Sequence, residues 1–251
     1  MTNQTFKKDK LTVHVLEDRL ALGRHAAAMA AEKLKTLART QDSIDIIFAA
    51  APSQNEFLAA LVSDKTIPWQ KINAFHMDEY IGLPAGAPQS FAHFLRTHIF
   101  DKVPLASVHY IDGNAPDTEQ LRYTRLLGTH PPDVVFMGIG ENTHLAFNDP
   151  PVADFHDARL VKQVELDAVC RRQQVNDGCF ARLDEVPKYA ITLTIPALMM
   201  ARYIYCMVPG PTKRQAITHT LNEPVSETHP STILREHEHA HLFVDHQSYQ
   251  P

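Results

Sequence analysis

PDVVFMGIGENTHLAFNDPP, residues 132–151, joins a short apolar run to a dense group of polar side chains. The run Pro132–Gly138 is rich in β-branched and aromatic residues, as is typical of a strand buried inside a parallel sheet. The polar groups behind it would lose hydration there, which costs free energy unless they interact with one another or with a ligand. Polar residues this dense after a buried strand therefore indicate a functional site.

Similar runs alternate with longer stretches at helical spacing throughout the chain. Strands are predicted at 11–16, 44–50, 72–77, 108–111, 132–138, 190–194, 203–208 and 241–245. Helices are predicted at 18–38, from 52 onward, and at 89–100, 117–127 and 211–221. This alternation predicts an α/β fold, in which a doubly wound, mostly parallel, Rossmann-like sheet carries helices on both faces. No repeat or Gly/Ser-rich linker divides the sequence, so we expect a single domain over residues 1–251.

The composition argues against several classes of protein. The 251 residues are 44% hydrophobic and carry a formal net charge of −5 without a basic run, which argues against a nucleic-acid partner. No apolar run reaches the roughly 18 residues of a membrane span, and the first residues lack an apolar signal segment. Three cysteines without a paired framework indicate a reducing compartment. We therefore expect a cytoplasmic protein without a membrane partner.

Four polar clusters follow predicted strands, at 51–53, 76–80, 138–149 and 209–213. Ligands of open α/β sheets bind beyond the carboxyl ends of the strands, so these clusters are candidate sites. The last cluster places Lys213 at a helix start, where backbone N–H groups and the helix dipole favour a phosphate. Ser53, with Glu56 at capping-box spacing, predicts a second helix start beside the same anion. The alternative for Lys213 is a solvated surface lysine.

The cluster at 76–80 offers a candidate general base. Asp78 follows a strand that should be buried, and a partly desolvated carboxylate has a raised pKa suited to moving protons. Glu79 either supports Asp78 or faces solvent. The alternative is that Asp78 only caps a turn.

His144 is the candidate acid–base of the cluster at 138–149, because an imidazole titrates near neutral pH. A carboxylate beside it, Glu141 or Asp149, would fix the tautomer of the ring. The alternative is a histidine with a structural role.

Three more histidines, His237, His239 and His241, alternate as on one face of a strand and could bind zinc. The chain offers no matching carboxylate motif, so we favour a polar edge strand or loop and expect no metal. The scattered cysteines are expected to fill apolar space.

The chain resembles the glucosamine-6-phosphate deaminase (isomerase) family, within the superfamily of sugar-phosphate isomerases and 6-phosphogluconolactonases. Its motifs occur in the family's order: FHMDEYIGLP at 75–84, QSFAHFLRTHIFDKV at 89–103, GNAPD at 113–117, FMGIGENTHLAFNDP at 136–150, VPKYAITLTI at 186–195 and VPGPTKRQAI at 208–217. MDEYIGLP together with G-x-G-x-x-x-H-x-A-F-N is specific, and the lactonase branch lacks this combination. The glycines of this motif, Gly138 and Gly140, are expected beside the substrate.

The resemblance implies that an amino-sugar 6-phosphate and water become fructose 6-phosphate and ammonia, by ring opening and proton transfer from C2 to C1. It implies that Asp78 is the base at C2 and His144 the ring-opening acid–base. Asp149 matches a family glutamate that orients this histidine, and Lys213 and Ser53 match phosphate-binding positions. The resemblance implies no cofactor and no partner beyond a sugar phosphate, and it is compatible with a homo-oligomer.

Three departures from the family pattern bear on this function. Asn142-Thr143 replace the usual Asp-Gly before the histidine, so the group expected to orient His144 is uncharged. AAAPSQNEF replaces the usual Gly-rich phosphate loop. The family's lid arginine has Arg171 and Arg172 as nearby candidates.

The sequence is also compatible with two other functions. A lactonase would use His144 to activate water on a sugar lactone, and a sugar-phosphate-binding regulator would keep the phosphate site without turnover. Asn142 motivates the second alternative. If Asn142 is only a weakened orienter, Asn142→Asp should speed turnover. Unchanged or lower turnover would mean that the site is rebuilt, with Glu141 as a candidate centre.

Overall fold

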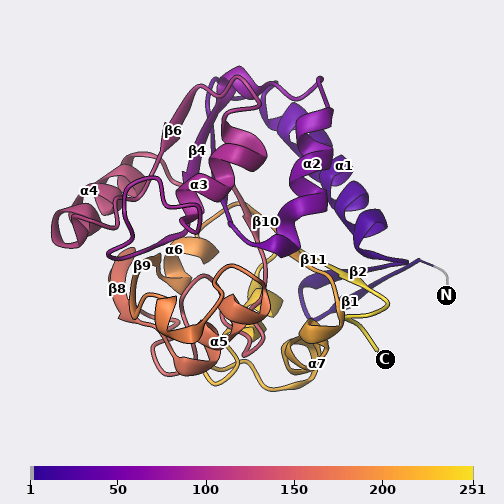
Figure 1. The fold of residues 1–251 in the computed structure, drawn as a ribbon. Coiled ribbons are helices and arrows are strands. Elements are labelled where there is room, and N and C mark those ends of the chain that lie inside the picture. The colour runs from indigo at the N-terminus through magenta and orange to yellow at the C-terminus, as the bar shows by residue number, and fades with distance from the viewer. Residues whose placement is uncertain (1–2, 251) are drawn as a thin grey trace.

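A computed structural model of the protein describes residues 3–250 and contains, within them, two sheets (Figure 1). The larger sheet has eight strands in the order β1-β2-β11-β10-β7-β3-β4-β6. Their bounds are β1 Gln4–Lys8, β2 Leu11–Leu16, β3 Ile44–Phe48, β4 Ile72–His76, β6 Ser107–His109, β7 Val134–Met137, β10 Tyr203–Val208 and β11 Ala240–Asp245. All neighbours pair in parallel except β1 and β2. The predicted mostly parallel sheet is confirmed.

The smaller sheet is antiparallel, in the order β5-β9-β8. Its strands are β5 Asp78–Tyr80, β9 Tyr189–Leu193 and β8 Val161–Glu165. The strand predicted at 190–194 therefore exists but belongs to this second sheet, because its backbone pairs with the segment just beyond β4. Strands β1, β5 and β8 were not predicted, since they are short and carry several polar residues.

Helices lie between the strands, as the alternation of the sequence predicts. The α-helices are α1 Arg19–Leu37, α2 Asn55–Ser63, α3 Phe91–Leu95, α4 Pro116–Thr129, α5 Ala168–Asn176, α6 Ile195–Met199 and α7 Arg214–Asn222. Shorter turns are η1 Pro52–Gln54, η2 Trp69–Lys71, η4 Leu183–Glu185, η5 Pro211–Lys213 and η6 Pro230–Glu236, and η3 Arg96–Phe100 is a π-helical continuation of α3. Asp18 begins α1 by accepting a hydrogen bond from the Ala21 N–H at 2.8 Å.

Successive side chains of the central strands point to opposite faces of the large sheet. Ile46 and Phe48 of β3 join a core with α1, α2 and α3, whereas Ile47 joins a core with α4, α6 and α7. Helices therefore cover both faces, and the predicted doubly wound arrangement is confirmed.

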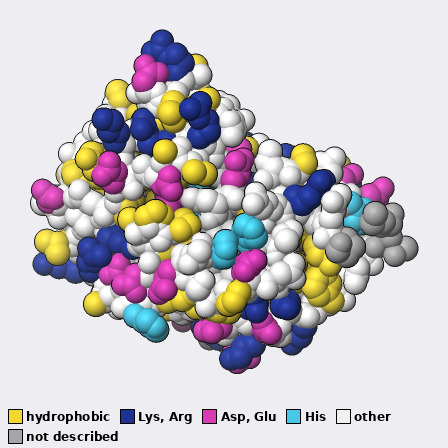
Figure 2. Space-filling view, turned by 90° about the horizontal axis from the view of Figure 1, so that it is seen from below, with side chains coloured by type: hydrophobic (Ala, Val, Ile, Leu, Met, Phe, Trp, Pro, Cys, Tyr) yellow, Lys and Arg dark blue, Asp and Glu magenta, His cyan; other side chains and the backbone are white. Residues whose placement is uncertain are grey.

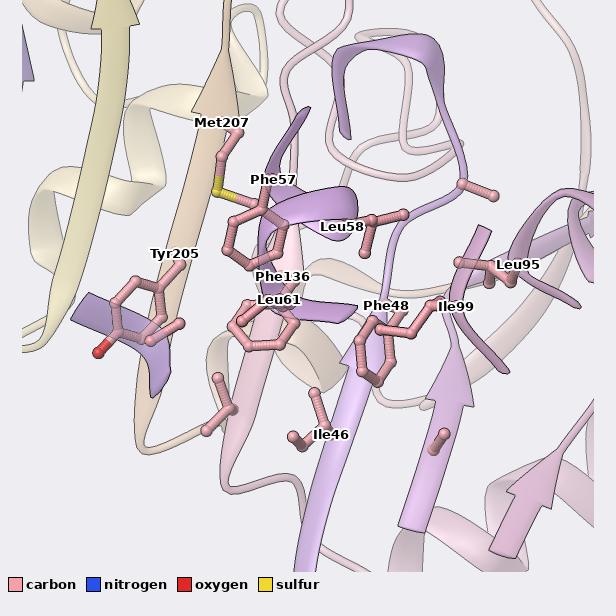
Figure 3. Packing of buried hydrophobic residues seen from close by; sticks show 14 of the residues in the cluster. Ile46, Phe48, Phe57, Leu58, Leu61, Leu95, Ile99, Phe136, Tyr205 and Met207 are labelled. Carbon is pink, nitrogen blue, oxygen red and sulfur yellow. The ribbon is translucent and has the colours of Figure 1, made fainter. Parts of the chain in front are cut away.

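Aromatic packing fixes the ends of β3 and β7 against α2 (Figure 3). The ring of Phe136 lies 5.3 Å from that of Phe48 and 4.8 Å from that of Phe57, both in steep edge-to-face contacts. All three side chains are buried. Burial of a large apolar side chain contributes roughly 1.5–3 kcal/mol, so this contact holds the strand ends and the loops that follow them in a defined position.

The start of α2 differs from the predicted capping box. Ala51 precedes η1 without a side-chain hydrogen bond, and α2 begins only at Asn55. Glu56 accepts hydrogen bonds from Arg19, and Ser53 accepts one from Gln54 Nε2 at 3.0 Å. The prediction that Ser53 caps this helix is therefore wrong, because tertiary contacts engage both members of the expected box.

The three alternating histidines do not share a strand face. His237 and His239 lie in the loop before β11, where His237 Nε2 is 2.8 Å from the Ala201 carbonyl oxygen. His241 lies in β11, with its Nδ1 3.1 Å from His14 Nε2. The loop prediction is right for the first two and the edge-strand prediction is wrong for His241. β11 is an interior strand between β2 and β10, and the residues that follow His241 are buried.

The surface seen in Figure 2 mixes the two signs of charge, with Lys and Arg side chains interspersed among those of Asp and Glu. Such a mixture gives no extended field of one sign on that face. Each helix within residues 3–250 is too short or too polar to cross a membrane.

Candidate active site

A pocket of about 310 Å³ lies beyond the carboxyl ends of four adjacent strands, β10, β7, β3 and β4. β3 and β7 are neighbours, although the chain passes through β4 and β6 on one side of the sheet before it returns to β7. This change of direction opens a crevice between connecting loops, where ligands of α/β proteins bind. Its polar lining residues are Arg19, Ser53, Asp78, His144, Gln173, Gln174, Asp177, Thr212 and Lys213. All four predicted clusters thus meet in one pocket.

Asp78 is the buried carboxylate of this pocket. It follows β4 by two positions and is 7% exposed. Burial, with a smaller contribution from the charge of Glu79, raises the pKa of Asp78 well above its ordinary value of 3.8. A carboxyl group of this kind can both take and return a proton near neutral pH.

His76 fixes the backbone that carries Asp78. Its Nδ1 lies 2.9 Å from the Asp78 carbonyl oxygen, and its Nε2 accepts the Ile111 N–H at 2.8 Å. Burial lowers the pKa of His76 to about 4, so the ring is neutral and donates from Nδ1. His76 therefore acts as a structural link between β4 and the chain after β6.

Glu79 is neither solvent-facing nor in the pocket. Its two carboxylate oxygens accept the backbone N–H groups of Tyr80, Phe91 and Ala92 at 2.9–3.1 Å. The carboxylate thus caps the start of α3 and stabilises the segment just after Asp78. Of the two alternatives for Glu79, the solvent-facing position is wrong, and these hydrogen bonds support the backbone next to Asp78.

His144 lines the pocket with Nδ1 turned towards two oxygen atoms. Nδ1 lies 2.7 Å from Asn142 Oδ1 and 2.9 Å from Asp149 Oδ1. Asn142 Nδ2 donates to the same Asp149 oxygen at 2.8 Å. Because both oxygens are acceptors, Nδ1 carries the ring proton and Nε2 keeps its lone pair for the pocket. The short Asp149 side chain reaches the histidine directly.

Asp149 is the fully buried charge behind this histidine. Burial raises the pKa of Asp149, but the charge of His144 and hydrogen bonds from His144 and Asn142 outweigh it and leave the pKa below 3.8. An ionised Asp149 therefore stabilises the imidazolium that forms when Nε2 takes a proton.

Ligand atoms of His144, Asp149 and Cys170 lie within 4.8 Å of one another and could in principle hold a metal ion. Nδ1 and the carboxylate already bond to each other, however, and burial raises the pKa of the Cys170 thiol well above its usual range. A thiolate ligand would have to form against that shift. The arrangement fits a protonated hydrogen-bond network better than a metal site.

Glu141 does not contact His144. Its N–H donates to Gln173 Oε1 at 2.8 Å, and its own Oε1 is buried without a hydrogen-bond partner among the described residues. The structure thus brings Asn142 and Asp149, rather than Glu141, to the histidine. A catalytic role for Glu141 gains no support from these contacts.

Backbone shape limits what can stand around the histidine. A Cβ added at Gly140 would overlap the His144 ring, and one added at Gly138 would lie 3.2 Å from Ser53 Oγ. Thr143 holds a positive φ of 72°, a conformation that costs a β-branched residue roughly 1–2 kcal/mol. Gly138 and Gly140 both line the pocket, where close approach explains the two glycines.

Lys213 belongs to a second part of the pocket lining. The side chain is 6% exposed, and burial lowers its pKa, while the carboxylates of Asp177 and Glu141 oppose that shift. Gln54 ties this part together, since its Nε2 donates to the carbonyl oxygens of Met137 and Met207 at 3.3 and 3.4 Å. Ser53 and Lys213 thus face one space from two different strand ends.

The two arginines expected near the phosphate lie outside the pocket lining. Arg171 Nη2 donates to the carbonyl oxygens of Leu183 and Val186 at 2.7 and 2.9 Å, which ties α5 to η4. Arg172 is exposed. The phosphate-binding role of either residue stays a prediction without a contact to support it.

Four charged or amide residues of the pocket were not predicted, namely Arg19, Gln173, Gln174 and Asp177. The two glutamines lie in α5 and Asp177 directly follows it, and the sequence AVCRRQQVN has too little apolar periodicity to predict a helix. Arg19 stands at the start of α1, and no local signal relates it to residues 30 or more positions away.

Residues 17–243 match the family described as glucosamine-6-phosphate isomerases/6-phosphogluconolactonase, and the chain belongs to this family. It is 30% identical over 232 residues to a glucosamine-6-phosphate deaminase of Streptococcus equi subsp. zooepidemicus, an alignment that covers 92% of this chain and 94% of the relative.

Two solved structures share the fold. A monomeric glucosamine-6-phosphate deaminase superposes with a TM-score of 0.85 at 24% identity, over 94% of this chain and 98% of the other. A 6-phosphogluconolactonase from Thermotoga maritima gives 0.76 at 22% identity, over 94% and 99%. At these identities, the two likenesses establish the fold alone.

Proposed function

We propose that this protein is a glucosamine-6-phosphate deaminase, which converts glucosamine 6-phosphate and water to fructose 6-phosphate and ammonia. One observation carries the proposal: the buried carboxyl of Asp78 and the free Nε2 of His144 open onto the same pocket as Lys213. A base, an acid–base and a cation are the three groups that the reaction requires. The similarity to curated deaminases over nearly the whole chain supports the same activity.

Ring opening would use His144. Nε2 takes the proton of the anomeric hydroxyl, the bond between C1 and the ring oxygen breaks, and that oxygen receives the proton. Asp149 stabilises the imidazolium during this step, since it lies 2.9 Å from Nδ1. The product is an open-chain aldehyde that keeps its amine at C2.

Proton transfer would use Asp78. The carboxylate takes the proton from C2, O1 takes a proton from solvent, and the electron pair forms a double bond between C1 and C2. Asp78 then returns its proton to C1, which leaves a protonated imine at C2. Water adds to this carbon, ammonia leaves, and the proton that O1 took up is released to solvent, which gives the ketone. The raised pKa of Asp78 suits both directions of the transfer.

The test is ammonia and fructose 6-phosphate formation from glucosamine 6-phosphate, measured together with hydrolysis of 6-phosphogluconolactone. We expect equal amounts of the two deamination products, and loss of both in Asp78→Asn. Lactone hydrolysis without ammonia would replace the proposal by a lactonase. Tight fructose 6-phosphate binding without any turnover would replace it by a sugar-phosphate-binding protein.

We infer a reducing compartment, such as the cytoplasm, from the thiols. Cys170, Cys179 and Cys206 are free, and burial raises the pKa of Cys179 to about 11. Thiols of this kind are unreactive and need no disulfide partner.

A further inference from the structure

Arg19 is a cation at the pocket that the sequence motifs did not predict. It is the first residue of α1 and lies in the pocket lining. Its Nε and Nη2 donate to the two carboxylate oxygens of Glu56 at 2.7 and 2.9 Å, and Nη2 also donates to the Pro52 carbonyl oxygen at 2.9 Å. No residue within 3–250 accepts a hydrogen bond from Nη1, so this nitrogen is available as a donor.

The pocket needs a second cation if a phosphate binds there. A phosphate monoester carries about −1.5 to −2 charges at neutral pH. Among the described lining residues, Arg19 and Lys213 are the two lysines or arginines. Lys213 is partly compensated by Asp177 and Glu141, whose charges act on its pKa. The part of the pocket lining that comes from α5 and the residue after it offers the amides of Gln173 and Gln174 and the carboxylate of Asp177, but no cation.

We propose that Arg19 binds the substrate phosphate together with Lys213, an inference that rests on the proposed sugar-phosphate function. Glu56 holds the guanidinium plane in place through a two-point contact, which reduces the side-chain entropy lost on binding. The bond to Pro52 ties Arg19 to the same turn that presents Ser53. The free Nη1 supplies a positively charged donor, whereas Gln173 and Gln174 supply only neutral amide donors.

Substitutions of Arg19 and Glu56 are expected to have opposite effects on anion binding, although the two residues form one ion pair. Removing the arginine deletes a phosphate donor and a positive charge. Removing the charge of Glu56 deletes a competing anion, while a glutamine oxygen can still accept a hydrogen bond from the guanidinium. A purely structural ion pair would instead make both variants change anion binding in the same direction, because either substitution removes the ion pair.

The experiment measures fructose 6-phosphate and inorganic phosphate binding by calorimetry, and KM and kcat for glucosamine 6-phosphate, in Arg19→Gln and Glu56→Gln. Arg24→Gln is the matched control, because Arg24 is an exposed arginine of the same helix outside the pocket lining. We expect Arg19→Gln to raise the Kd of both ligands and the KM by about tenfold or more, with kcat changed less than about threefold. Glu56→Gln should bind as tightly as the parent or more tightly, and Arg24→Gln should match the parent.

An unchanged Kd in Arg19→Gln, or an equal loss in Arg19→Gln and Glu56→Gln, overturns the role of Arg19. The proposed function fails separately. If the parent binds fructose 6-phosphate through Arg19 but releases no ammonia, the deaminase activity is wrong and the phosphate role of Arg19 stands. If the parent releases ammonia and Arg19→Gln keeps its KM, the activity stands and Arg19 does not bind phosphate.

Discussion

Two parts of the pocket are built in different ways. The proposed catalytic part, formed by Asn142, His144 and Asp149, joins its side chains in a closed set of hydrogen bonds of 2.7–2.9 Å. The proposed phosphate-binding part, formed by Arg19, Ser53 and Lys213, contains an ammonium and a guanidinium Nη1 that donate no hydrogen bond within residues 3–250, although Glu56 pairs with Arg19 and the charges of Asp177 and Glu141 act on Lys213. A closed network holds a reactive group in one orientation before substrate arrives, whereas the free donors of the two cations stay available to a ligand.

The largest expected effect is that of Asp78, the proposed base. Asp78→Asn should lower kcat by about 10²–10⁴-fold, because an amide cannot take the C2 proton. The same change should raise the Tm at neutral pH by a few degrees, since it removes a carboxylate whose burial disfavours its ionised form. Turnover in single-turnover assays and thermal unfolding check the two parts.

The control for this expected stabilisation of Asp78→Asn is its dependence on pH. The folded-state pKa of Asp78 is raised above 3.8, so its carboxyl destabilises the folded protein progressively as pH rises above the unfolded-state value. The stability difference between Asp78→Asn and the parent should therefore be small near pH 3.5 and largest above the folded-state pKa. A difference that is constant with pH would contradict this account.

Gly140→Ala should disrupt the closed network from the backbone side. The added Cβ would overlap the His144 ring, so the imidazole must move away from Asn142 and Asp149. We expect kcat to fall by about 10²-fold with little change in phosphate affinity. Gly138→Ala is the matched control, because its Cβ meets neighbours only at 3.2–3.3 Å and should cost much less. Equal losses in the two variants would show that the histidine contact is not decisive.

Asn142→Asp tests whether the network is built around a neutral amide. In the parent, Asn142 Nδ2 donates to Asp149 Oδ1 at 2.8 Å, and a carboxylate there would set two acceptors against each other. We expect about tenfold lower turnover at neutral pH, because one of the two carboxyl groups must bind a proton for the substituted side chain and Asp149 to stay within hydrogen-bond distance of each other. The pH–rate profile of kcat checks this, with an added ionisation expected in the variant. Faster turnover would show that Asn142 is only a weakened orienter.

The smallest effect is expected for the arginines of α5. Arg172→Gln should leave KM within about twofold of the parent, since this exposed side chain lies outside the pocket lining. Arg171→Gln should lower the Tm without a comparable rise in the Kd for phosphate, because its guanidinium bonds two backbone carbonyls. A tenfold rise in KM for Arg172→Gln would instead place the family's lid arginine at this position.

Much of the fold is readable from local pattern. The strands at 11–16 and 203–208 occur with the predicted bounds, since short runs that are mostly apolar and rich in β-branched or aromatic residues are favourable when buried in a sheet. β9 shows the limit, because its pattern marks it as a strand but not as a member of the second sheet. The bounds of α3 also changed, as the predicted helix at 89–100 is a short α-helix followed by a π-helical segment.

The candidate site, too, is predicted only in part. Its predicted residues follow strand ends, namely Asp78, His144, Asp149, Ser53 and Lys213. The carboxyl ends of parallel strands lie at the same edge of the sheet, so residues that follow them come close together. Glu79 could not be placed in advance, because its partners Phe91 and Ala92 lie beyond an intervening loop. Arg171 has the positive charge that a phosphate site needs, but its guanidinium bonds the carbonyl oxygens of Leu183 and Val186 instead of lining the pocket. The sequence alone does not show which carbonyl groups lie near α5.

The sequence by itself determined the alternation of strands and helices, the edge of the sheet where polar groups collect and the chemical types available there. These features depend on local hydrophobic pattern and chain order. The tertiary structure alone decided that Asn142 and Asp149, rather than Glu141, hold His144, and that Arg19 joins the pocket from the start of the first helix. Side-chain direction and pairing between distant segments depend on packing, which no local pattern specifies.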